Sequence, residues 1–463
     1  MKNLKDLKIA YIGGGSRGWA RTLMNDLASE ELLGGTVNLY DIDMMAAKQN
    51  EIIGNKLSSR QDVKGKWKYV TFSDINTALK GADFVVISVL PGTFNEMESD
   101  VHEPEKYGIY QSVGDTTGPG GIVRALRTVP MFMEFAKAIE KNCPNAWVIN
   151  FTNPMSICVR TLYKVFPKIK AFGCCHEVFG TQNLLQKIYQ DKFGEKVTRD
   201  DIKINVFGVN HFTWIDKANC KGVNLVKLYG EYIEEHKNEI IENKDENWAN
   251  NYFANHDLVK FDLFKRYGII AAAGDRHLAE FCPAKWYLKD LETINKFGFA
   301  ITPVSWRKKD LENRIKSTKE LLDGKQFNLG DSGEEFVRQI KALLGIAPLT
   351  TNINIPNQGQ IKNLPLGAVV ETNACIFGDT VQPVYAGEIP MSVNALIYRV
   401  CVEQETVVEA ALTGNYELAF NAFINSQNVN LDLDEARTLF DQMLYNTKEY
   451  LPAYENYINK RKD

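Results

Sequence analysis

The chain has 463 residues, of which 44% are hydrophobic and 24% are charged, and its formal net charge is -4. This balance is typical of an ordinary globular protein, and the lack of basic excess makes nucleic acid and anionic membranes poor partners. No apolar run approaches a membrane-spanning length, and nothing at the N-terminus resembles a signal peptide. The eight cysteines show no disulfide-framework spacing, which favours a reducing cytoplasm.

The N-terminal stretch predicts a strand, a tight turn and a helix. A β-rich run over residues 9–12 meets Gly13, Gly14, Gly15 and Ser16, and apolar residues then recur at helical spacing. Glycines let a backbone approach a pyrophosphate closely, while the following helix presents unpaired N–H groups. The pattern favours dinucleotide binding over a tight turn that holds no cofactor.

Three further residues complete the predicted cofactor site. Asp41 ends the next predicted strand, where an acid can bind the adenosine ribose of NAD. Arg17 directly follows the glycine turn, and Pro91 lies in the loop after the buried run over residues 82–89.

Successive predicted strands end in polar residues. The strand over 146–151 leads to Asn153, and the strand over 169–174 leads to Cys175 and His176. Because the carboxyl ends of parallel strands share one edge of a sheet, we expect these residues at one rim. The glycine-rich stretch 113–121, which contains Asp115, is either a site loop there or a surface turn.

The length predicts two lobes, with a boundary near residue 195. Residues 1–195 are expected to form an NAD-binding α/β domain with a parallel sheet. Residues 196–463 are expected to form a catalytic, substrate and oligomerisation domain, in which a strand over 202–209 leads to His211. Strands of a mixed sheet are predicted over 352–370, and a largely helical tail from residue 391.

Cys175 and His211 are the candidate metal ligands. Thiolate and imidazole both bind first-row divalent ions, and two protein ligands leave positions open for substrate oxygens and water. Judged by spacing alone, Cys175 could equally be a small buried residue and His211 a loop histidine with local hydrogen bonds.

Seven motifs in order from the first strand to about residue 400 resemble family 4 of the glycoside hydrolases. They are Gly13–Ser16, Gly114–Gly121, Asn153-Pro154, Cys175–Val178, Asn210-His211, Asn354–Asn357 and Leu364-Pro365. The resemblance implies a Rossmann-like first domain similar to lactate and malate dehydrogenases, followed by an α+β domain. It also implies a redox-elimination mechanism, in which NAD takes hydride from C3 of the sugar and a base removes the C2 proton.

The resemblance also implies roles for individual residues. Cys175 and His211 match manganese ligands, although another divalent metal could serve, and Asn153 matches a substrate-binding asparagine. His176 occupies the position of the proposed general acid, and an imidazole suits that role. It could instead hydrogen-bond a substrate hydroxyl.

Asp275 falls where the C2 base is expected, and Asp115 matches an acid that tunes this base. The alternative for Asp275 is a cap on the helix that runs through Leu278. Arg276 is predicted to bind a substrate carboxylate, because a guanidinium can bind carboxylate in a bidentate manner. Its alternative is a structural salt bridge.

The departures from the family pattern bear on the substrate. Phospho-sugar members carry other residues after the metal cysteine, where this chain has His176–Val178, and an arginine where it has Met97. The Cys-His-Glu-Val variant resembles the branch that acts on α-galacturonides. Neutral α-glucosides, α-galactosides and α-glucuronides stay open, as do an NAD-dependent sugar or 2-hydroxy-acid dehydrogenase and a nucleotide-sensing protein. Family likeness implies a homodimer or homotetramer.

Overall fold

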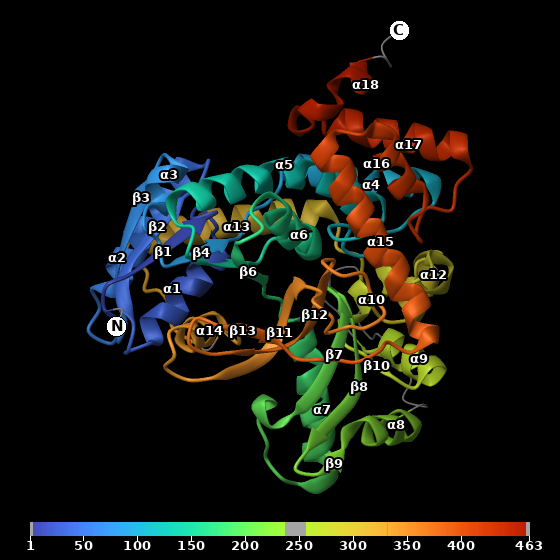
Figure 1. Ribbon diagram of the computed structural model, residues 1–463, viewed down its shortest axis with the longest axis horizontal. Helices are drawn as coiled ribbons and strands as arrows, with labels where there is room; N and C mark the ends of the chain where they lie inside the picture. Colours follow the sequence, from blue (N-terminus) through green and yellow to red (C-terminus); the bar gives the residue numbers. More distant parts are fainter. Residues whose placement is uncertain (1–2, 237–255, 331, 460–463) are drawn as a thin grey trace.

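The computed structural model describes residues 3–236, 256–330 and 332–459. Its centre is a mixed sheet of nine strands, surrounded by helices (Figure 1). In sheet order the strands are β13 (Val381–Pro383), β12 (Val369–Ile376), β11 (Leu349–Pro356), β6 (Lys170–Gly173), β5 (Trp147–Asn150), β4 (Phe84–Ile87), β1 (Leu7–Ile12), β2 (Gly34–Tyr40) and β3 (Lys66–Phe72).

Strands β1 to β6 are parallel and follow the order 3-2-1-4-5-6. This is the order of dinucleotide-binding sheets, in which ligands bind where the order reverses, here between β1 and β4. The predicted α/β fold with a Rossmann-like parallel sheet is therefore confirmed. Both faces of the sheet are covered, since Ile9 and Tyr11 pack into one apolar cluster and Ala10 and Ile12 into another. Burial on both faces explains the unbroken apolar runs of these strands.

The last three strands of this sheet come from the second half of the chain. β11 pairs antiparallel with both β12 and β6, and it meets β6 where Asn354 faces Gly173. The mixed strands predicted over 352–370 are thus present, in the same sheet as the glycine turn. The division into 1–195 and 196–463 stays a prediction.

Helix α5 (Gly118–Asn142) includes the last residues of the glycine-rich stretch 113–121, so the end of this stretch is helical. Close packing explains this. A Cβ on Gly120 would lie 2.6 Å from the carbonyl oxygens of Asp100 and Gly114, so only glycine fits there. Pro119 at the first turn favours helix initiation.

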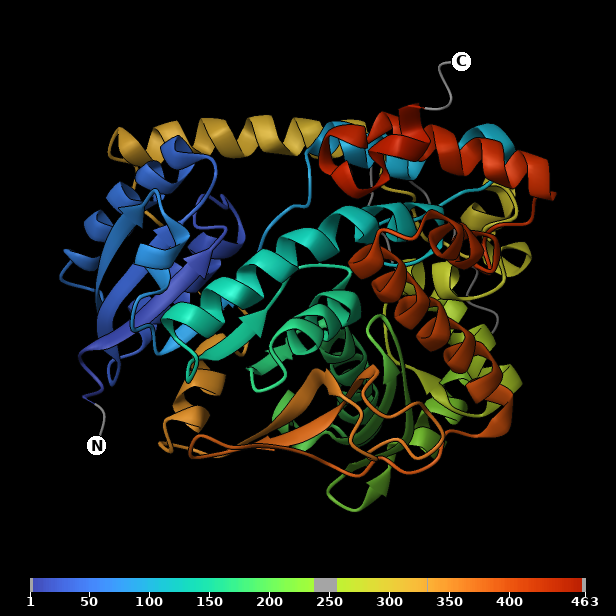
Figure 2. The ribbon, with the colours of Figure 1, turned by 45° about the horizontal axis from the view of Figure 1, so that its top comes forward.

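The remaining elements build the second half. A small sheet contains β7 (Lys203–Val209), β8 (Phe212–Cys220), β9 (Val223–Asn224) and β10 (Ile270–Ala271), and the predicted helical tail begins with α15 (Met391–Thr413). Helix α13 (Val304–Leu322) returns to the first half and contacts α2 (Met44–Ser58) and α4 (Phe94–His102), as Figure 2 shows. Within the described part of the chain, no helix combines the length and apolarity needed to cross a membrane.

Candidate active site

The glycine turn and Asp41 lie together at the end of β1. Gly13 has a φ of +97°, and a Cβ there would lie 1.9 Å from the carbonyl oxygen of Ser88. The N–H of Gly15 donates to Oδ2 of Asp41 at 2.8 Å, and Ser16 Oγ accepts the N–H of Trp19 at 3.1 Å. The tight turn thus brings backbone without side chains beside an acid, which fits a dinucleotide pyrophosphate and ribose.

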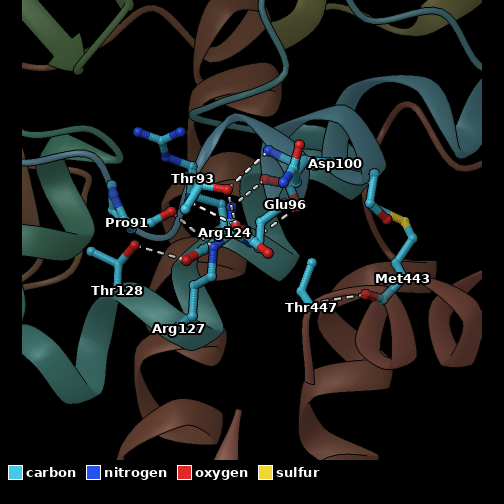
Figure 3. A network of polar contacts seen from close by, with 12 residues as sticks. Pro91, Thr93, Glu96, Asp100, Arg124, Arg127, Thr128, Met443 and Thr447 are labelled. Carbon is cyan, nitrogen blue, oxygen red and sulfur yellow. Dashed lines mark hydrogen bonds and ion pairs between the residues drawn. The ribbon is translucent and has the colours of Figure 1, made fainter. Parts of the chain in front are cut away.

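Arg17 directly follows this turn, and Pro91 lies in the loop after β4. Arg17 pairs with Asp43 at 3.7 Å, while its Nε is buried without a partner. The carbonyl oxygen of Pro91 accepts a bond from Nε of Arg127 at 3.0 Å (Figure 3). Arg127 also forms a bidentate ion pair with Asp100, and both side chains are fully buried. Sequence reasoning missed this pair, which holds the loop after β4 in place.

Cys175 and His211 are connected through Glu371. Cys175 follows β6, just before α7 (Glu177–Phe193), and its carbonyl oxygen accepts Nδ2 of Asn352 at 3.4 Å. Asn352 also donates to Glu371 at 2.6 Å, and Glu371 accepts Nδ2 of Asn210 at 3.1 Å. His211 is the next residue, in the tight turn between β7 and β8, where its φ is +66°. Its Nδ1 lies 3.3 Å from Oγ1 of Thr116. The fold therefore brings the two predicted metal ligands to one place.

The surroundings suit a divalent cation. Burial lowers the pKa of His211 to about 3, so its imidazole is neutral and can donate a lone pair. Burial, with Glu371 and Glu177 next in importance, raises the pKa of the Cys175 thiol. A bound dication would be stabilised by these carboxylates and would favour the thiolate. No three His, Cys, Asp or Glu side chains group as a metal site in the described ranges.

Sequence reasoning missed both carboxylates. Glu371 in β12 is 1% exposed and accepts bonds from Asn352 at 2.6 Å and Asn210 at 3.1 Å. Oε2 of Glu177 accepts the N–H of Gly274 at 2.8 Å. A single charge inside the apolar strand around residue 370 was the available signal for Glu371, because a buried carboxylate needs partners.

The loop that carries Asp115 is fastened to α10 (Asp275–Phe281). Oε1 of Glu280 accepts the N–H groups of Val113 at 2.6 Å and Gly114 at 2.8 Å. Ser112 donates its hydroxyl to the carbonyl oxygen of Arg276 at 2.5 Å, and Nη2 of Arg276 donates to the carbonyl oxygen of Ser112 at 3.1 Å. These bonds make Glu280 and Arg276 positioning residues for the loop.

Asp115 in turn connects to the metal pair. Its Oδ1 accepts the hydroxyl of Thr116 at 2.7 Å, and Thr116 contacts His211. Burial opposes ionisation, but Arg124 and then Arg307 outweigh it and hold the pKa of Asp115 at about 2. The carboxylate is therefore charged at neutral pH, and it lies beside the predicted catalytic centre.

Asp275 is fully buried and faces a neighbouring helix. Its Oδ1 accepts the N–H of Lys260 at 3.1 Å, in the first turn of α9 (Leu258–Tyr267). It therefore bonds the start of α9. Burial and the nearby Asp257 raise its pKa to about 7. Two residues further on, the ring of His277 packs on His211 with centroids 3.9 Å apart.

His176 and Asn153 have different partners. The side chain of His176 is 50% exposed, its Nδ1 lies 3.2 Å from Glu334, and its ring stacks on Trp19. The hydrogen bond with Glu334 raises its pKa, so the ring is a competent proton donor. The side-chain oxygen of Asn153 is buried without a partner, and its carbonyl oxygen accepts Nε of Arg124 at 3.2 Å.

The sheet order and the rim of polar residues define an α/β enzyme of the dinucleotide-binding class. Residues 8–190 match the profile of the family 4 glycosyl hydrolases, and residues 206–429 match that of the family 4 glycosyl hydrolase C-terminal domain. The chain therefore belongs to family 4 of the glycosyl hydrolases, and the resemblance noted in its sequence is confirmed. It is a glycoside hydrolase.

Similar proteins of known sequence and structure span nearly the whole chain. An α-galacturonidase of Thermoanaerobacterium saccharolyticum is 59% identical over 453 residues, which cover 97% of each chain. The crystal structure of the Bacillus subtilis protein lplD, described as a glucosidase, shares 49% identity, covers 95% of this chain and 100% of that one, and has a TM-score of 0.90. A 6-phospho-α-glucosidase from gut microorganisms, solved with NAD and Mn²⁺, shows the same fold at 20% identity and a TM-score of 0.77, over 96% and 99% of the chains.

Proposed function

We propose that this protein hydrolyses α-galacturonides by redox elimination, with bound NAD and a divalent metal ion, manganese or a similar one. The observation that carries the proposal is the 59% identity, over nearly the full length of both chains, to an α-galacturonidase. The Cys-His-Glu-Val motif at Cys175–Val178, which suggested the same substrate, lies beside the other predicted metal ligand.

The residues at the rim fit both groups. NAD would be held by Gly13–Ser16, Arg17, Asp41 and the Pro91 loop, since the backbone of a glycine turn can approach a pyrophosphate closely. Cys175 and His211 would hold the metal ion, whose charge Glu177 and Glu371 would balance. When bound, NAD supplies a hydride acceptor and the metal supplies a Lewis acid for the sugar oxygens.

The chain's own side chains would bind the sugar and move its protons. The unpartnered side-chain oxygen of Asn153 would accept a sugar hydroxyl. His176, exposed and paired with Glu334, would protonate the leaving oxygen. Asp275 is the proposed C2 base, and its carboxylate is held by the first turn of α9. The carboxylate of Asp115 would contribute a negative charge to the site beside His211.

A panel of p-nitrophenyl α-glycosides, assayed with NAD and Mn²⁺ under reducing conditions, tests this proposal. We expect the α-galacturonide to be cleaved fastest. The C2 proton of the sugar should exchange with solvent, and no net NADH should be produced. Preference for the α-galactoside, α-glucoside or α-glucuronide would refute the substrate, and net NADH production would favour a dehydrogenase.

The metal ligand is tested by Cys175→Ser, with Cys375→Ser as the matched control because Cys375 is exposed. We expect Cys175→Ser to abolish manganese-supported turnover while NAD binding persists, and Cys375→Ser to behave as wild type. Full activity of Cys175→Ser would remove this residue from the metal site.

The proposal includes a homodimer or homotetramer in the cytoplasm, with a small α-glycoside as its ligand. Large exposed apolar residues such as Met391 (84% exposed) and Leu366 (75% exposed) are consistent with contacts between copies. All eight cysteines are free in the structure, as a reducing compartment favours. Light scattering after size-exclusion chromatography would measure the assembly.

A further inference from the structure

Three arginines from three different helices act electrostatically on the Asp115 carboxylate. Arg124 belongs to α5, Arg276 to α10 and Arg307 to α13. Arg124 and Arg307 act on the charge of Asp115, and Arg307 also acts on the charges of Arg124 and Arg276. The charge of one carboxylate is thus influenced by three guanidinium groups.

Backbone contacts explain how α13 reaches this place. The N–H of Thr302 donates to the carbonyl oxygen of Ser112, in the loop that carries Asp115, at 3.4 Å. Val304, the first residue of α13, is fully buried and packs with Met97 and Val101 of α4. Arg307 lies three residues further along the helix, so it is on the same inward face as Val304.

The three arginines differ in what already occupies their N–H groups. Arg276 donates Nη2 to the carbonyl oxygen of Ser112 and so fastens the loop. Arg124 is 4% exposed, and its Nη1 is buried without a partner; the Nε of Arg307 is also buried without a partner. Leaving charged N–H groups buried and unpaired is costly, so these two side chains favour an anionic ligand.

The neighbouring Arg127 is a buried arginine whose charge is paired with a carboxylate. Arg127, one helical turn after Arg124, is neutralised by its bidentate pair with Asp100. Asp115 differs from Asp100, because Oδ1 of Asp115 already accepts the hydroxyl of Thr116. Arg124 and Arg307 together therefore carry more positive charge than Asp115 alone balances, and a planar carboxylate would supply further negative charge.

We propose that Arg124 and Arg307 together bind the C6 carboxylate of the uronic acid, and that Arg276 positions the loop instead. The inference rests on the proposed α-galacturonidase function. Arg124 also bonds the backbone of Asn153, whose side-chain oxygen is free for a sugar hydroxyl. The carboxylate and a hydroxyl of one sugar would then be recognised from adjacent residues.

The test compares Arg307→Met with Arg276→Met in the full-length enzyme loaded with NAD and Mn²⁺. The measured quantity is the ratio of kcat/KM for p-nitrophenyl α-galacturonide to that for the α-galactoside. We expect Arg307→Met to lower this ratio about 10- to 100-fold, mainly through KM, because a hydrogen-bonded charge pair is lost. Arg276→Met should lower both rates in similar proportion. Lys308→Met, at the exposed neighbouring position, should leave the ratio unchanged.

Calorimetric binding of D-galacturonate and D-galactose gives a second readout that needs no turnover. We expect Arg307→Met and the conservative Arg124→Lys to weaken galacturonate binding selectively. A ratio unchanged in Arg307→Met, or lowered only in Arg276→Met, would overturn the inference. A wild-type enzyme that cleaves neutral glycosides but no galacturonide would instead overturn the proposed function, before any variant is compared.

Discussion

The buried ion pair between Asp100 and Arg127 permits a quantitative prediction. The two side chains are 0% and 1% exposed, and they are joined by two hydrogen bonds between α4 and α5. Asp100→Asn would keep the shape of the side chain but remove its charge, leaving Arg127 charged and buried without compensation. Breaking such a pair costs about 3–5 kcal/mol.

The expected change can be measured as a melting temperature. In a protein of 150–250 residues, a loss of 1 kcal/mol in the free energy of unfolding lowers the Tm by about 2–4 °C. In a chain twice as long, the same loss lowers the Tm by about half as much. We therefore expect Asp100→Asn to lower the Tm by about 3–10 °C. Because Nε of Arg127 holds the carbonyl oxygen of Pro91, NAD binding, followed by fluorescence titration, should weaken as well.

A matched control exists on the surface. Arg437 in α17 (Leu433–Asn446) forms a bidentate pair with Glu417 in α16 (Tyr416–Ile424), and these side chains are 34% and 66% exposed. Exposed pairs contribute about 0–1 kcal/mol, so Glu417→Gln should change the Tm by at most about 2 °C. If Asp100→Asn also changes the Tm by at most about 2 °C, the assignment of a buried, uncompensated charge to Arg127 is wrong.

Two further predictions concern Glu280 and the glycine turn. Burial raises the pKa of Glu280 to about 7, so only the unfolded state ionises between about pH 4.5 and 7, and stability falls as pH rises. The side chain introduced by Glu280→Gln cannot ionise, so the Tm of this variant relative to the wild-type Tm should rise between about pH 4.5 and 7. Curves of Tm against pH that stay parallel for the two proteins would contradict the reasoning. Gly13→Ala should abolish NAD binding, since its Cβ would overlap the carbonyl oxygen of Ser88, whereas Gly180→Ala, with open space around it, should bind normally in the same titration.

The sequence alone was sufficient for the features that depend on local pattern. Strand runs, the glycine turn and the acid after the second strand predicted a dinucleotide-type sheet, and the structure confirms its order. Cys175 could be placed at the rim, because the carboxyl ends of parallel strands lie on one edge. The motifs of residues 13–16 and 175–178 were also sufficient for the family, which the comparison confirms.

Only the tertiary structure revealed partners that are far apart in sequence. Glu371 comes from a strand that joins the sheet from the second half of the chain, and Arg307 comes from a helix that returns to the first half. The sequence predicts that Arg276 binds a carboxylate, and only the structure shows that its side chain bonds Ser112, in the loop that carries Asp115. Local periodicity reports which face of an element is buried, but charge balance in a site depends on which helices meet there, and that is decided by long-range packing.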